Sequence, residues 1–158
     1  MFLYRISKRA HIRDLTGAGA RLYGGRWNHR GVSLLYTSES RSLATVEYLV
    51  HLSLPEAPGD LSMVKLEVPE DIVPEELDRS LLPKNWRKSP APIKLAELGS
   101  EWARSRRSLL LRVPSAVVEQ EHNILINPTH DDMPRVKLLR IQPYRLDELG
   151  RIEHGVIS

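Results

Sequence analysis

The amino-acid sequence predicts an α+β fold in one domain, with a mixed, mainly antiparallel sheet and flanking helices. Strand-like segments occur early and late in the chain, and helix-like segments lie between them. The 158 residues suit one domain in length. No internal repeat, low-complexity tract or Gly/Ser linker divides the chain. We therefore expect residues 1–158 to form a single domain.

The first two strands are expected on either side of a glycine-rich connection. Phe2–Ser7 and Val32–Thr37 have the composition of short strands. The connection between them contains five glycines, at positions 17, 19, 24, 25 and 31. A helix is expected over residues 38–54, because serines precede its apolar residues and Pro55 follows its end.

The second half of the chain adds one helix and four expected strands. Leu61–Val68 alternates apolar and polar residues, as a half-buried strand does. Pro92 favours the start of a helix over Ile93–Ser105. Further strands are expected over residues 109–113, 123–126 and 136–142. Residues 83–92, with three prolines, are expected to form a loop within the domain.

The composition excludes several kinds of chemistry. The chain has no cysteine, which excludes disulfides, thiol nucleophiles and thiolate zinc sites. His122, His130, Asp131 and Asp132 match no metal-ligand spacing, so no metal is expected. No apolar run is long enough for a membrane span or a signal-peptide core. These absences favour a cytoplasmic protein with no membrane contact.

The positive charge is concentrated in the first third of the chain. Residues 1–50 carry eight Lys/Arg and three Asp/Glu, although the net charge of the whole chain is only +3. Arginine suits phosphate or carboxylate groups, so this excess indicates either an anion site or a solvated basic face. The Arg104–Arg107 cluster has no interleaved aromatic residues, which makes direct nucleic-acid binding the weaker interpretation.

Glu47 is the most informative position in the helix expected over residues 38–54. At about 100° per residue, Glu47 falls on the same face as Leu43, Val46 and Val50. A carboxylate on an apolar face needs a partner, because burial disfavours its ionised form. Two interpretations remain open. Glu47 forms a buried ion pair with an early arginine, or it lies at a cleft floor to bind a hydroxyl or stabilise positive charge.

The segment from Gly24 to Asn28 has the composition of a binding loop. Its two glycines allow positive φ or a close approach to a ligand. Arg26 then supplies a guanidinium, Trp27 a stacking surface and Asn28 an amide. This combination suits a flat, phosphorylated ligand, although a tight turn with a surface tryptophan has the same composition. The segment matches neither common nucleotide-binding glycine motif. Tyr36 could add a second aromatic face or a hydroxyl.

Two polar residues border the late strands. Ser115 follows Val113-Pro114, and no G-x-S-x-G motif supports a nucleophilic serine. Ser115 is therefore expected to orient a substrate amide or a carboxylate, or only to bond its local backbone. Asn127 ends the strand over residues 123–126 and is a candidate ligand-binding amide.

Taken in chain order, these segments resemble the RES-domain toxins, a family named for an Arg, a Glu and a Ser. The ordered set is specific and covers most of the chain. It comprises Tyr4-Arg5-Ile6, Gly17 through Asn28, Leu35–Glu39, Leu43–Glu47, Leu98-Gly99 with Trp102, Val113–Val118 and Asn123–His130. The named residues would be Arg26, Glu47 and Ser115, with Tyr36 as a fourth site residue.

This resemblance implies a fold related to the ADP-ribosyltransferase toxins. It also implies the toxin of a type II toxin–antitoxin pair, whose Xre-like helix-turn-helix antitoxin blocks the active site. NAD+ would be the substrate, consumed by hydrolysis or phosphorolysis, and no separate cofactor is expected. Transfer of ADP-ribose to a cellular protein is the alternative. An RNA-binding or RNA-cleaving toxin is a more distant one.

The residues suit this chemistry. Cleavage of a nicotinamide–ribose bond builds oxocarbenium character on the ribose, which Glu47 would stabilise. Arg26, and also Arg5, would bind the pyrophosphate. Tyr36 would stack on the nicotinamide, and Ser115 would position the amide or Glu47. Trp27, Asn28 and Asn127 complete the expected ligand contacts.

Overall fold

The computed structural model describes residues 1–50 and 59–145. Its larger elements are two helices, α2 and α3, a short helix α1, and seven strands. Their bounds are β1 Phe2–Lys8, α1 Ala18–Tyr23, β2 Leu35–Ser38, α2 Arg41–Val50, β3 Leu61–Glu67, β4 Glu75–Glu76, α3 Ile93–Ser105, β5 Leu110–Pro114, β6 His122–Ile126 and β7 Lys137–Tyr144, with short 3₁₀ turns at Arg79–Leu81 and Met133–Arg135.

The seven strands form one mixed sheet in the order β4-β5-β6-β2-β1-β3-β7. All neighbouring strands are antiparallel except β4 and β5, which are parallel. The predicted α+β class and mainly antiparallel sheet are confirmed. None of the helices among residues 1–50 and 59–145 is long and apolar enough to cross a membrane.

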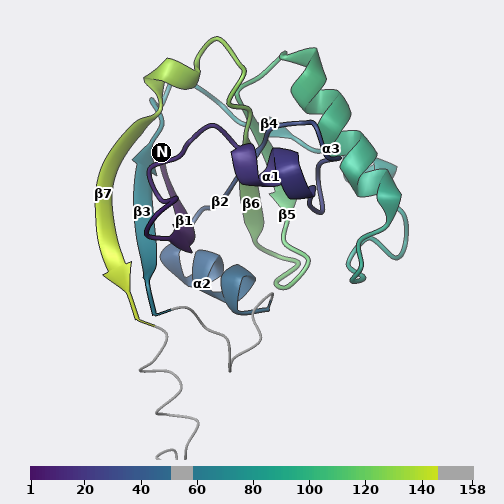
Figure 1. The fold of residues 1–158 in the computed structure, drawn as a ribbon. Coiled ribbons are helices and arrows are strands. Elements are labelled where there is room, and N and C mark those ends of the chain that lie inside the picture. The colour runs from purple at the N-terminus through teal and green to yellow at the C-terminus, as the bar shows by residue number, and fades with distance from the viewer. Residues whose placement is uncertain (51–58, 146–158) are drawn as a thin grey trace, which may run out of the picture.

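The sheet is divided between β1 and β2. These strands share a single registered pair, Tyr4 with Ser38. By contrast, β1 and β3 stay paired along the whole of β1, from Phe2–Glu67 to Lys8–Leu61. One half of the sheet is therefore β4-β5-β6-β2 and the other is β1-β3-β7, as Figure 1 shows. The separation of β1 from β2 opens a cleft at the centre of the molecule.

Two apolar clusters hold this arrangement together. The first joins the half-sheets, because Leu3 and Val64 from one half are buried with Ile124 and Ile126 from the other. The second lies beneath α3, where Trp102 and Leu95 pack with Trp27, Leu111 and Leu125. Neighbouring residues of β6 belong to different clusters because successive side chains of a strand point to opposite faces.

The predicted elements differ from the observed ones mainly around the cleft. The helix predicted over residues 38–54 begins at Arg41, because Ser38 still belongs to β2. Residues 51–54 lie outside the described part of the chain. Strand β2 begins at Leu35 rather than at Val32. Neither α1 nor the short β4 was predicted, and the predicted bounds of α3 are confirmed.

Candidate active site

Two adjoining cavities occupy the cleft between the half-sheets. The larger, of about 500 Å³, lies between β1, the loop after it and α1. The smaller, of about 230 Å³, lies between β1, the end of β2 and α2. Arg5, Ile6 and Tyr36 line both cavities, so the two cavities are neighbours that share these residues as a wall.

The Glu47 carboxylate is held in place by two neutral donors. Its Oε1 accepts hydrogen bonds from Ser115 Oγ at 2.6 Å and from Asn123 Nδ2 at 2.7 Å. The Asn123 amide is itself oriented, because its Oδ1 accepts a hydrogen bond from Ser38 Oγ at 2.6 Å. Strands β2 and β6 place Ser38 directly opposite Asn123. Strand pairing therefore fixes one end of the Glu47 carboxylate.

This geometry separates the two interpretations of Glu47. Within residues 1–50 and 59–145, Glu47 forms no ion pair with an arginine. The half-buried side chain lines the smaller cavity, and its Oε2 accepts no hydrogen bond from the described residues. The carboxylate thus belongs to a cleft, with one oxygen anchored and the other available to a ligand.

Ser115 acts through Glu47. Its side chain is fully buried, and its hydroxyl donates to Glu47 while accepting hydrogen bonds from the backbone N–H groups of Val117 at 3.1 Å and Val118 at 3.0 Å. A hydroxyl has one proton to donate, and here it is given to the carboxylate. Ser115 is a positioning residue in this geometry, because its hydroxyl is buried away from the cavities and holds the Glu47 carboxylate.

Arg26 lies on a tight turn close to the site, although it lines neither cavity. Gly24 has φ of +72°, and the Gly25 N–H donates to the Asn28 carbonyl at 3.0 Å. The Arg26 guanidinium donates through Nη1 to the Trp86 carbonyl at 2.8 Å, which joins the turn to the loop over residues 83–92. Burial lowers the pKa of Arg26, and the nearby Glu47 carboxylate opposes that shift. The guanidinium remains charged, because arginine is protonated in proteins at any physiological pH.

Two hydrogen bonds of its hydroxyl group fix the position of the Tyr36 side chain. Its oxygen accepts a hydrogen bond from the Trp27 N–H at 3.1 Å and donates one to Asn28 Oδ1 at 2.5 Å. Burial raises the pKa of Tyr36, so the phenol stays neutral at any physiological pH. Its ring forms part of the wall of both cavities, between the carboxylate of Glu47 and the larger space.

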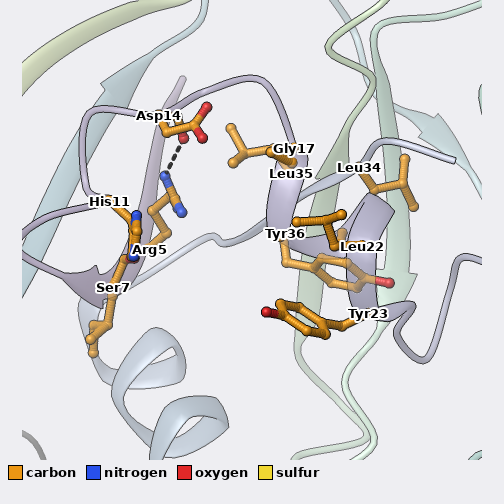
Figure 2. Close-up of a pocket in the computed structure, with 14 residues that line it drawn as sticks. Arg5, Ser7, His11, Asp14, Gly17, Leu22, Tyr23, Leu34, Leu35 and Tyr36 are labelled. Atoms are coloured by element: carbon orange, nitrogen blue, oxygen red, sulfur yellow. Dashed lines mark hydrogen bonds between the residues drawn. The ribbon is translucent and has the colours of Figure 1, made fainter. Parts of the chain in front are cut away.

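Arg5 lies where the two cavities meet. Its Nη1 donates to the carbonyl oxygens of Asp14 at 3.0 Å and Ile12 at 3.4 Å, which directs the side chain along the loop after β1. Figure 2 shows Arg5 and Asp14 on one side of the larger cavity, with Tyr36, Tyr23 and Leu22 on the other. Burial lowers the pKa of Arg5, and the charge of Asp14 opposes that shift.

Three predicted ligand contacts have structural positions instead. Trp27 is only 3% exposed and packs in the cluster beneath α3, so it is neither a stacking surface for a ligand nor a surface tryptophan. The Asn28 side chain is fully hydrogen-bonded within the protein: its Oδ1 accepts from Tyr36, and its Nδ2 donates to three backbone carbonyls. Asn127 is fully buried, bonds Ala103 and Thr129, and lines neither cavity of the cleft.

Asn123 was not among the predicted site residues. Its position as the polar start of an apolar strand was visible in the sequence. The pairing of β2 with β6, which places Asn123 next to Ser38 and within reach of Glu47, was not. The backbone carbonyl of Trp86, which accepts from Arg26, carried no sequence signal, because any residue supplies one.

Substitution of Asn123 by alanine should loosen the carboxylate without unfolding the protein. The variant removes one of two donors to Glu47 Oε1 and the acceptor of Ser38. Small misplacements of reacting groups slow a reaction strongly. For the reaction catalysed at this site, we therefore expect the rate constant kcat to fall about 10–100-fold with little change in KM. Steady-state kinetics measure this effect, and Asn85→Ala, in the exposed loop, is the matched control. An unchanged rate would remove Asn123 from the site.

Removal of the Tyr36 hydroxyl should lower stability. In Tyr36→Phe, the Trp27 N–H loses its acceptor and Asn28 Oδ1 loses its donor. Unpaired buried polar groups cost about 1–3 kcal/mol, so the free energy of unfolding in urea should fall by that amount. Tyr23→Phe is the control, because the Tyr23 side chain is 78% exposed. Equal stability of the two variants would contradict the assignment.

The fold and the site together define a class of protein. It has an α+β architecture with a divided sheet, and the cavities of its central cleft are lined by an anchored carboxylate, Arg5 and a tyrosine, with the charge of Arg26 nearby. Residues 2–147 match the RES domain. The chain therefore belongs to the RES-domain family.

Named relatives of this chain are toxins. The chain is 40% identical over 136 residues to the Prs ADP-ribosylating toxin of Sphingobium sp. (strain YBL2), covering 85% of this chain and 84% of that protein. It is 40% identical over 144 residues to Toxin Res of Yersinia enterocolitica, covering 90% and 93%. Toxin Res of Photorhabdus laumondii is 37% identical over 159 residues, covering 100% and 96%.

A solved structure shares the fold. A chain in the crystal structure of the M. tuberculosis MbcT–MbcA toxin–antitoxin complex superimposes with a TM-score of 0.74. The match covers 98% of this chain and 89% of that one, at 18% sequence identity. The fold is thus shared by proteins whose sequences have diverged widely.

Proposed function

We propose that this chain is the toxin of a toxin–antitoxin pair, and that it cleaves the nicotinamide–ribose bond of NAD+ in the cytoplasm. The observation that carries the proposal is the Glu47 carboxylate, anchored through Oε1 at the wall of a cleft and open to a ligand through Oε2. A fixed carboxylate that forms no ion pair with any described residue suits a reaction that develops positive charge on its substrate.

The remaining site residues supply the other requirements of this reaction. As the bond to nicotinamide breaks, the ribose acquires oxocarbenium character and nicotinamide leaves as a neutral molecule. Glu47 Oε2 stabilises the cation and accepts a hydrogen bond from a ribose hydroxyl. Arg5 and Arg26 offset the charge of the pyrophosphate, and Tyr36 gives the nicotinamide ring a flat face. Water or phosphate then attacks the ribose carbon that nicotinamide has left, which gives ADP-ribose or its phosphate ester.

A protein as the acceptor of ADP-ribose, in place of water or phosphate, has specific support. The relative from Sphingobium is named an ADP-ribosylating toxin, and transfer of ADP-ribose from NAD+ breaks the same bond. The alternative function is therefore an ADP-ribosyltransferase that modifies a cellular protein. The two functions share every site residue and differ only in the nucleophile that reaches the ribose.

An antitoxin is the proposed partner. A structure with the same fold comes from a toxin–antitoxin complex, and a toxin that consumes NAD+ would poison its own cell without an inhibitor. We propose an Xre-like helix-turn-helix protein that covers the cleft. Co-expression with such a protein from the adjacent reading frame should yield a complex that releases no nicotinamide.

The direct test follows free nicotinamide from purified, antitoxin-free protein incubated with NAD+, with and without phosphate. Nicotinamide release is expected, and the sugar product identifies water or phosphate as acceptor. NAD+ labelled in the ADP-ribose half, added to lysate, distinguishes transfer, because only transfer leaves label on protein. Absence of both nicotinamide release and labelled protein would overturn the proposal. Steeply salt-dependent RNA binding would instead favour a nucleic-acid target.

A further inference from the structure

The loop over residues 83–92 supports the candidate site from outside the cleft. None of its residues lines either cavity. Trp86 anchors this loop at two points. Its side chain packs against the apolar cluster beneath α3, and its carbonyl accepts the hydrogen bond from Arg26. The backbone is therefore fixed in place immediately before the next residue, Arg87.

The loop between β5 and β6, residues 115–121, carries a group that holds Glu47. It begins at Ser115, whose hydroxyl donates its proton to the Glu47 carboxylate. The hydroxyl keeps this orientation because the N–H groups of Val117 and Val118 occupy its two lone pairs. The conformation of the β5–β6 loop thus decides where the Ser115 proton points.

Arg87 joins the two loops through adjacent backbone carbonyls. Its Nε donates to the Ala116 carbonyl at 3.0 Å, and its Nη2 donates to the Val117 carbonyl at 3.3 Å. Its Nη1 donates to Glu119 Oε2 at 3.3 Å, but both side chains of this ion pair are nearly half exposed, so the ion pair by itself contributes little. The main contact is the planar fork of Nε and Nη2 on two consecutive carbonyls, a geometry that lysine cannot reproduce.

We propose that Arg87 is a positioning residue for the reaction at Glu47. By holding the carbonyls of Ala116 and Val117, it fixes the loop whose N–H groups direct the Ser115 hydroxyl toward the carboxylate. Arg87 lines neither cavity, so it acts through Ser115 rather than on a ligand. The inference rests on the proposed function for the identity of the reaction, whereas the contact between the two loops stands on the geometry.

The first test measures amide hydrogen exchange at Val117 and Val118 by NMR in the antitoxin-free protein, which needs no turnover. In Arg87→Ala, the β5–β6 loop loses two charge-assisted hydrogen bonds and should open more easily, so exchange at both amides should become about ten-fold faster. Lys88→Ala, at an exposed position of the same loop as Arg87, is the matched control and should keep the native exchange rates. Native exchange rates in Arg87→Ala would overturn the inference.

The second test measures turnover of NAD+. Arg87→Ala should lower kcat about ten-fold with little change in KM, because a misdirected carboxylate affects the transition state more than substrate binding. Arg87→Lys should lose as much, since lysine keeps the charge without the fork. Glu119→Gln should keep the native kcat, since it removes only the exposed ion pair. A native kcat in Arg87→Ala or Arg87→Lys, or an equal loss in Glu119→Gln, would overturn the inference.

A double-mutant cycle tests whether Arg87 acts through Ser115. Ser115→Ala lacks the hydroxyl that the β5–β6 loop orients, so adding Arg87→Ala should lower kcat less than about two-fold further. A further loss of about ten-fold in that background would overturn the assignment. Absence of both nicotinamide release and labelled protein with the native chain would instead overturn the proposed function, and amide exchange would still decide the role of Arg87.

Discussion

Glu47→Gln is expected to lower nicotinamide release from NAD+ by about 10²–10³-fold, the range observed when one preorganised electrostatic contact to a transition state is lost. Glutamine keeps the shape of the side chain and an oxygen that can accept from Ser115 and Asn123, so the local structure should persist. The variant removes the negative charge that would face the developing oxocarbenium ion. The loss should therefore appear in kcat more than in KM.

The control for this prediction is Glu97→Gln, at an exposed position of α3. That variant should retain native turnover, and both variants should retain native unfolding curves. Native turnover by Glu47→Gln would show that the charge of this carboxylate does not stabilise the transition state. Loss of the folded state in Glu47→Gln would reveal a structural role for the charge.

Gly99→Ala is expected to have the largest effect on stability. Gly99 lies in α3 against the turn that carries Arg26, and a β-carbon at this position would lie 1.9 Å from the Trp27 carbonyl oxygen and 2.8 Å from its carbon. Both contacts are with backbone, which cannot rotate away. The helix and the turn must therefore separate, with a loss in the free energy of unfolding of about 1–3 kcal/mol or more.

The displacement should also reduce activity, because the same turn donates the Trp27 N–H to Tyr36 and carries Arg26. Gly19→Ala is the matched control for stability, since a β-carbon there meets nothing within 4 Å and the residue lies in α1. Alanine should leave the stability unchanged or raise it by about 0.5–1 kcal/mol. Urea unfolding compares the two variants, and equal stabilities would contradict the packing argument.

Elements with strong local signals were predictable from the sequence. Helix α3 was predicted with its observed bounds, because Pro92 favours a helix start immediately after it. The fold class followed from the order of strand-like and helix-like segments. Helix α1 was not predicted, because glycine-rich segments have weak helix propensity.

The candidate site was only partly predictable from the sequence. Glu47 was identified because a carboxylate on an apolar helix face is costly, and that cost is visible in sequence. Ser115 was expected to orient an amide or a carboxylate, and it does hold Glu47. The sequence did not reveal that Asn123, rather than an arginine, is the second partner of Glu47. Trp27, Asn28 and Asn127 are residue types that often bind ligands. In the structure all three are buried, and the two asparagine side chains donate hydrogen bonds to backbone carbonyls.

The sequence by itself determined which chemistry is open to this protein: no thiols, a basic first third, and an ordered set of arginine, tyrosine, glutamate and serine. Tertiary structure decided where these groups act. Partial separation of β1 from β2 turned one sheet into two halves with a cleft between them. Strand pairing is a long-range property set by packing of both faces, so no local pattern shows where a sheet divides.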